Sequence, residues 1–135
     1  MSTIGILVVV WCVVGVMVLF RVRRRHVHSL PEVSDEVFGA YCQSRFGMDP
    51  VNAVIERKEV SRLLGIPMEK LSPEMRLGQL VANPLDTATK VGLGDLEFDL
   101  SDLARRAGVS ARITMPSTVA EVVKLRLDLK SARHG

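Results

Sequence analysis

The chain begins with a long apolar run that is followed at once by a basic cluster. Residues 4–20 carry no charged side chain, and Ile, Leu, Val and Phe fill 12 of these 17 positions. At 1.5 Å per residue, a helix over this run is about 25 Å long, slightly shorter than a hydrocarbon core of about 30 Å. The basic cluster consists of Arg21, Arg23, Arg24 and Arg25. The pattern predicts a membrane anchor with a basic juxtamembrane cluster over residues 1–25.

The position of the arginines predicts how the anchor is oriented. A cleaved signal peptide has positive charge before its apolar core and small residues after it, whereas here residues 1–3 lack Lys and Arg and arginines follow the core. Because Lys and Arg favour the cytoplasmic side, we expect a single-pass protein of the inner (plasma) membrane with its N-terminus outside. Membrane lipid is then an expected partner, and the arginines either touch anionic headgroups or only set the topology.

Beyond the cluster, apolar residues recur at helical spacing between start and stop signals. We expect a linker over residues 26–33, a helical cytoplasmic domain over 34–128 and a tail over 129–135. The expected helices begin at Ser34, at Asp49-Pro50, at Ser72-Pro73, near Asp95 and at Thr118, where capping residues or proline precede apolar stripes. Residues 96–100 also alternate like a strand, and residues 83–94 have no clear pattern. The fold class predicted is all-α: a transmembrane helix followed by a small bundle of four or five helices.

Charge and motif content exclude most chemical functions. The chain has 18 Lys and Arg; without the four juxtamembrane arginines, 14 remain against 15 Asp and Glu, so the domain is nearly neutral. A neutral domain gives no reason to expect nucleic-acid binding. The run Gly92-Leu93-Gly94 lacks the third glycine of a dinucleotide fingerprint. The three histidines lie in the linker and tail without a second ligand pair, so no metal is expected.

The remaining reactive residues also favour a non-enzymatic protein. Cys12 lies in the apolar run, and Cys42 lies on the apolar side of its predicted helix, which is typical of a buried structural thiol. The acidic run from Asp95 begins like a calcium loop, but Leu100 and Arg106 stand where glycine and glutamate are required. With no converging nucleophile, base or metal set, we expect neither catalysis nor a cofactor.

One segment also has the pattern of a helix-turn-helix. Residues 100–110 read like its first helix and its turn, with Gly108 in the turn. The residues that would form the recognition helix, 111–116, contain Pro116 and two β-branched residues. A membrane-tethered DNA-binding protein therefore stays an alternative.

Three segments resemble acyl carrier proteins, in the order in which that family has them. Residues 64–67 read Leu-Gly-Ile-Pro and residues 71–80 read Leu-Ser-Pro-Glu-Met-Arg-Leu-Gly-Gln-Leu, which resembles the loop after the family's first helix. Residues 96–109 resemble its second helix, with a Gly-Val step at the end, and residues 117–123 resemble the start of its last helix. The match spans residues 55–127, and it implies a carrier-like bundle.

The chain departs from this family at the residue that carries the prosthetic group. Carrier proteins attach phosphopantetheine to the serine of an Asp-Ser-Leu triplet, and no such triplet occurs here. The sequence is closer to a bacterial group of carrier-like proteins in which the serine is absent and a Gly-Asp pair occupies the region. An atypical carrier remains an alternative, and its attachment site would be Thr87 or Ser101.

The resemblance implies an interaction module rather than an active carrier. In the family, an acidic second helix is the surface that partners recognise. The equivalent surface here would consist of the four carboxylates Asp95, Glu97, Asp99 and Asp102, which would dock a protein partner. A solvated acidic helix face explains the same four residues equally well.

Overall fold

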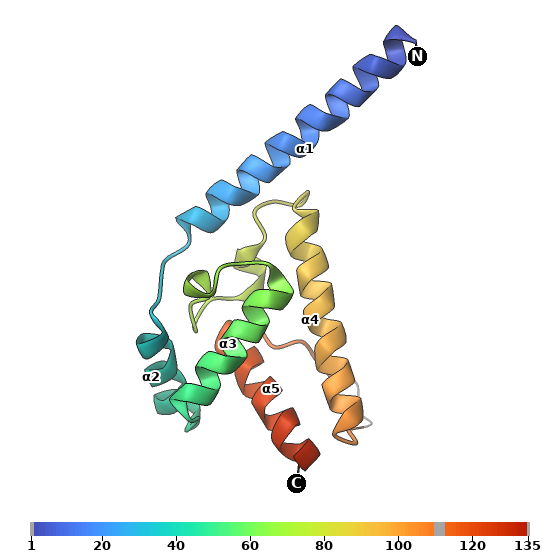
Figure 1. Ribbon diagram of the computed structural model, residues 1–135. Coiled ribbons are helices and arrows are strands. Elements are labelled where there is room, and N and C mark those ends of the chain that lie inside the picture. The colour runs from blue at the N-terminus through green and yellow to red at the C-terminus, as the bar shows by residue number, and fades with distance from the viewer. Residues whose placement is uncertain (1, 110–112, 135) are drawn as a thin grey trace.

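The computed structural model of the chain describes residues 2–109 and 113–134 and opens with one continuous helix, α1, Thr3–Ser29 (Figure 1). α1 is long and apolar enough to cross a membrane, by length and composition alone. It runs through the arginines and includes residues 26–29, so the predicted linker over 26–33 is wrong in its first half. The helix continues because arginine is a good helix former and no glycine or proline intervenes. It stops at Leu30, whose backbone is extended because Pro31 follows.

The next two helices begin and end where the local signals predict. α2, Asp35–Phe46, is capped by the Ser34 side chain and ends at Gly47, with φ +69°. α3, Pro50–Leu64, is capped by Asp49 and ends at Gly65, with φ +66°. In both cases glycine takes the left-handed conformation that other residues adopt only at a cost.

The helix predicted to start at Ser72-Pro73 does not form. The segment between α3 and α4 is a long loop with two 3₁₀ turns, Met68–Lys70 and Leu77–Leu80. Its backbone bonds to the chain just before α5: Leu77 N–H donates to Ser117 O at 3.0 Å, and Val119 N–H donates to Met75 O at 3.0 Å. These non-local bonds satisfy the backbone groups that a helix would have paired internally.

The last two helices are longer than the sequence predicts. α4, Thr87–Arg106, includes residues 87–94, where the sequence has no clear pattern. Residues 96–100, whose sequence alternates like a strand, are helical. α5, Val119–His134, begins where the Thr118 hydroxyl accepts from the Glu121 N–H, as the capping spacing predicts. It also includes most of the predicted tail over 129–135, which is therefore wrong, because Leu129 is buried and extends the helix's packed face.

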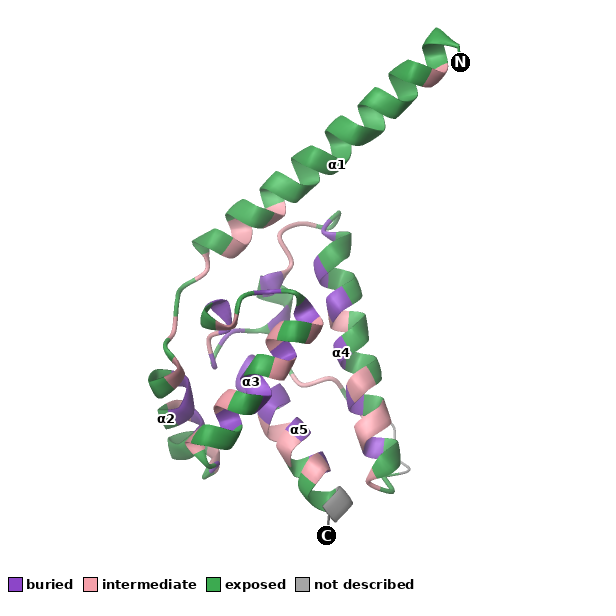
Figure 2. Cartoon of the chain, viewed as in Figure 1, coloured by how far each residue is buried: buried purple, intermediate pink, exposed green. Residues whose placement is uncertain are grey.

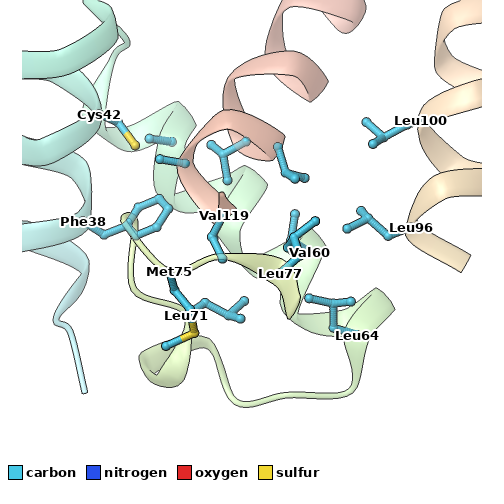
Figure 3. Close-up of a cluster of buried hydrophobic side chains, with 14 of the residues drawn as sticks. Phe38, Cys42, Val60, Leu64, Leu71, Met75, Leu77, Leu96, Leu100 and Val119 are labelled. Carbon is cyan, nitrogen blue, oxygen red and sulfur yellow. The ribbon is translucent and has the colours of Figure 1, made fainter. Parts of the chain in front are cut away.

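The helices α2 to α5 surround one apolar core, whereas α1 projects from it (Figure 1). α3 packs against α2, α4 and α5. In Figure 2 the residues coloured as buried lie within the bundle of α2 to α5, while α1 is exposed along almost its whole length. Phe38, Leu64, Leu96 and Val119 meet in the core from four different helices (Figure 3). The all-helical fold with an N-terminal apolar helix and a helical bundle is confirmed.

Candidate functional site at the junction of α1 and α4

Arg23 of α1 joins the apolar helix to the bundle. Its Nε donates to the Thr89 hydroxyl at 3.1 Å, and a terminal nitrogen donates to the Gly65 carbonyl at 3.3 Å. Nε also lies 3.6 Å from the Asp86 carboxylate. One guanidinium thus contacts the start of α4 and the end of α3. Since a planar guanidinium has five donors in a fixed geometry, these contacts restrict the orientation of α1 on the domain.

Asp86 is the residue that Arg23 meets at the start of α4. Its carboxylate is buried and accepts from the Ala82 N–H at 2.9 Å and from the Thr89 N–H at 3.2 Å. Burial raises the pKa of this carboxyl, but these hydrogen bonds and the charge of Arg23 outweigh it, so its pKa lies below the usual value. Asp86 is therefore a helix N-cap held as a carboxylate beside α1.

The C-terminal end of α1 is held by the long loop. Lys70, which is buried, donates from Nζ to the carbonyls of His28 and Leu30 at 3.1 Å each. His26 Nε2 lies 2.7 Å from the Gln79 carbonyl oxygen. A lysine that binds the last carbonyls of a helix satisfies acceptors that lack an internal partner. Together with Arg23, these bonds connect α1 to the domain over residues 23–30.

The four juxtamembrane arginines are not equivalent. Arg23 is turned toward the bundle and is largely buried, with 20% of its side chain exposed. Arg21, Arg24 and Arg25 are exposed, and they line an open groove of about 470 Å³ on α1. Of the four, only Arg23 donates side-chain hydrogen bonds to the bundle within the described part of the chain, whereas Arg24 also lines a groove that it shares with Gly65, Pro67 and Glu69 of the bundle.

The two candidate attachment residues lie far apart on α4. Thr87 is the exposed first residue of the helix, and its hydroxyl donates to the Leu85 carbonyl at 3.3 Å. Ser101 is also exposed, but it lies 14 residues further on, roughly 21 Å along the helix. Only Thr87 lies at a helix start next to an aspartate, the position that carrier proteins use for their serine.

The four acidic residues of α4 do not form one free surface. At 100° per residue, Glu97 points away from the side that Asp95, Asp99 and Asp102 share. Asp99 pairs with Arg126 of α5, and Asp102 pairs with arginines of its own helix, 2.5 Å from Arg105 and 3.1 Å from Arg106. Asp95 and Glu97 are exposed and form no ion pair with a described residue.

Asp99 belongs to a buried ionic cluster that sequence reasoning missed. Arg126 donates to Glu56 at 2.8 Å, and Lys130 donates to the other Glu56 oxygen at 2.6 Å. The side chains of Glu56 and Arg126 are each 4% exposed. This cluster ties α3, α4 and α5 together. The local signals for it were Glu56 and Arg126, charged residues within the apolar stripes of α3 and α5.

A second buried cation holds α2 against α3. Arg57 donates to the Asp35 carboxylate at 2.9 Å and to the Val33 carbonyl at 2.7 Å, and its guanidinium carbon lies 4.6 Å from the centre of the Phe38 ring. Burial lowers the pKa of Arg57, against the influence of Asp35. The nearby Cys42 is buried as predicted, and burial raises its pKa to about 11 although the charge of Arg57 lowers it. A thiol with this pKa is a poor nucleophile.

α4 exposes apolar side chains next to Asp95. Phe98 is 76% exposed and Val91 is 57% exposed. With Asp95 they follow one side of the helix at a spacing of four and three residues. We define this as the α4 outer stripe, Val91, Asp95 and Phe98. The seven-residue interval between Val91 and Phe98 was the signal that sequence reasoning could have used.

The described part of the chain also bears on metal binding and on the helix-turn-helix alternative. No group of three or more His, Cys, Asp or Glu among these residues is placed to hold a metal. The expected recognition helix, residues 111–116, lies partly outside the described residues, at 111 and 112, and residues 113–116 are not helical. Comparison of the chain with family models, curated proteins and solved structures gives no significant match.

Proposed function

We propose that this protein is a single-pass membrane protein whose cytoplasmic domain is an interaction module without catalysis of its own. The observation that carries the proposal is the attachment of α1 to the bundle through Arg23, which makes the apolar helix part of the domain's architecture. The exposed arginines after the apolar run favour an N-terminus outside and a domain in the cytoplasm, at the inner membrane. A tethered domain of fixed orientation is suited to presenting one surface to a protein partner.

The α4 outer stripe is the docking surface that the side chains support best. An aromatic ring as exposed as Phe98, next to a valine and a carboxylate, has the composition of a small interface core with a polar neighbour. The carrier-protein resemblance favours the same helix, because the family's partners recognise the helix that follows the long loop. The docking surface proposed here differs from the all-acidic set, since Asp99 and Asp102 already pair within the domain.

Site-specific crosslinking in intact membranes tests this docking surface. A photo-reactive amino acid replaces Val91, Asp95 or Phe98 one at a time, with Asn52 and Ser131, both exposed on other helices, as control positions. We expect the same higher-mass protein adduct from the three stripe positions and no such adduct from the controls. In addition, Phe98→Asp should remove the adduct formed at position 95. Equal crosslinking from all five positions would contradict a specific surface.

A carrier with an atypical attachment site is the second candidate, and Thr87 is the observation that favours it. Its exposed hydroxyl at the start of α4, directly after Asp86, is accessible to a modifying enzyme. The intact mass of the protein from its own membranes decides the matter. A gain of one phosphopantetheine that Thr87→Ala abolishes and Ser101→Ala retains would establish carrier activity. An unmodified mass would rule out the carrier, and the interaction module would stay the proposed function.

A further inference from the structure

We propose that the bundle itself contacts the membrane, through the loop before α4 and the first turn of that helix. In this proposal Leu85 and Ala88 enter the boundary between the headgroups and acyl chains of the bilayer that holds α1. The proposal rests on the proposed function, because it requires α1 to span the membrane. It adds a second membrane contact, made by residues some 60 positions away from the anchor in the sequence.

The position of the loop along α1 sets its depth. Leu85 and Ala88 line the same groove of about 250 Å³ as Val16, Leu19 and Phe20, the last apolar turns of α1. In a spanning helix the arginines from Arg21 onward lie at the headgroups, so the residues just before them lie at the edge of the hydrocarbon. Side chains beside Leu19 and Phe20 therefore lie at that edge too. Figure 1 shows the start of α4 directly beneath α1.

The exposure of the loop indicates that lipid is what covers it. Leu85 is 66% exposed and Phe20 is 65% exposed, and the two face the same groove. A leucine that is left in water at a loop tip loses the stabilisation that burial in an apolar medium gives. The groove is continuous with the apolar surface of α1, which lipid must cover in any spanning arrangement. The same acyl chains can fill the groove and cover Leu85.

The charges of α4 are distributed as this contact requires, with the exposed carboxylates away from the start of the helix. At the start of α4 the one acidic group, Asp86, is buried against Arg23, whereas Lys90 is exposed. Free carboxylates begin at Asp95, eight residues or roughly 12 Å beyond Thr87 along the helix. With the exposed arginines of α1, the start of α4 is basic, which complements an anionic cytoplasmic leaflet. The exposed Glu32 and Glu69 lie elsewhere along α1, in the groove that Arg24 and Val27 line.

The consequence is a fixed distance between the docking surface and the membrane. Phe98 lies 11 residues beyond Thr87, roughly 16 Å along α4. With both Arg23 and Leu85 engaged, α4 cannot swing freely about the end of α1. A partner would then meet the α4 outer stripe at one height above the bilayer.

Tryptophan quenching in vesicles tests the contact, because Trp11 in the apolar run is the only tryptophan of the chain. The full-length protein is inserted into vesicles of phosphatidylcholine and phosphatidylglycerol whose acyl chains carry bromine either near the headgroup or near the chain end. In a Trp11→Phe background, tryptophan replaces Leu85, Ala88 or, as the control, Val51. Val51 is 65% exposed, close to the 66% of Leu85, but it lies in the first turn of α3, at the end of the domain away from α1 (Figure 1).

We expect Leu85→Trp and Ala88→Trp to be quenched more by shallow than by deep bromine, with blue-shifted emission, and Val51→Trp to be unaffected. Native Trp11 should be quenched more by deep bromine. Quenching of Trp11 without quenching at either loop position would overturn the loop contact and leave the anchor intact. Quenching at position 51 equal to that at position 85 would overturn it as well. Unquenched Trp11 would overturn the spanning anchor together with the contact.

Discussion

Gly92 allows α4 to lie directly on the backbone of α3, and replacing it with alanine tests this packing. A Cβ at position 92 would lie 3.0 Å from both the Cα and the carbonyl oxygen of Leu64 and 3.2 Å from the carbonyl oxygen of Leu63. These are main-chain atoms of a packed helix, so they cannot rotate away as a side chain could. Relief requires the two helices to separate. Gly94, two residues further along α4, has nothing within 4 Å of an added Cβ and is the matched control.

The size of the effect follows from two opposing contributions. Alanine stabilises a helix interior by about 1 kcal/mol relative to glycine, and this gain applies to Gly92→Ala and Gly94→Ala alike. Overpacking at position 92 adds a cost of about 1–3 kcal/mol. The free energy of unfolding of Gly92→Ala should therefore lie about 1–3 kcal/mol below that of Gly94→Ala. For a domain of this size, the difference corresponds to roughly 5–15 °C in melting temperature.

Thermal and urea unfolding of the full-length protein in mild detergent, followed by far-ultraviolet circular dichroism, measures this difference. Because both variants gain the same helix propensity, their difference reports the contact with α3 alone. Gly94→Ala should be more stable than the wild type, and Gly92→Ala should be the less stable of the two. Equal stability, or a more stable Gly92→Ala, would refute the close approach of α4 to the α3 backbone.

Three further predictions concern the buried Arg126, the buried Cys42 thiol and Arg23, which joins α1 to the bundle. Arg126→Ala removes the partner of Asp99 and leaves the buried Glu56 with Lys130 alone, so it should cost about 3 kcal/mol in urea unfolding, the lower end for a broken buried pair, whereas the exposed-pair control Lys124→Ala should cost at most about 1 kcal/mol. Because the folded-state pKa of Cys42, about 11, lies above the ordinary value of 9.0, the unfolded chain releases this proton first. Stability should thus fall between pH 9 and 11 by an amount on the order of 2 kcal/mol, and Cys42→Ala should remove that part of the pH dependence; an unchanged slope would contradict it. Arg23→Ala should speed hydrogen exchange of the amides in the first turn of α4, while Arg25→Ala, at an exposed position that lines only the groove on α1, should leave them unchanged.

Some features of the fold could be predicted because their causes are local. Ser34, Gly47, Asp49 and Gly65 mark helix ends correctly, since a cap or a left-handed glycine acts on backbone groups within four residues. The apolar run likewise predicts a helix long enough to span a membrane from length and composition alone. Neither inference depends on where the rest of the chain lies.

Other features depend on partners that are distant in the sequence. The loop after α3 has a helix start signal at Ser72-Pro73, but hydrogen bonds to residues 117–119 replace the helix. α5 continues to His134 because Leu129 packs into a core that no local pattern outlines. Long-range contacts of this kind override local propensity because burial and backbone pairing contribute more free energy than the start signal does.

The features of the candidate sites also divide into those with local causes and those that depend on distant parts of the chain. The sequence by itself determined an apolar helix followed by arginines, a nearly neutral helical domain and an acidic helix that includes Asp95 to Asp102. Only the tertiary structure decided that Arg23 turns inward to Asp86, that Asp99 pairs with the buried Arg126, and that Gly92 allows α4 to pack closely on α3. Residue type and spacing fix which charges and shapes are present, but the direction that each side chain takes depends on what packs beside it from elsewhere in the chain.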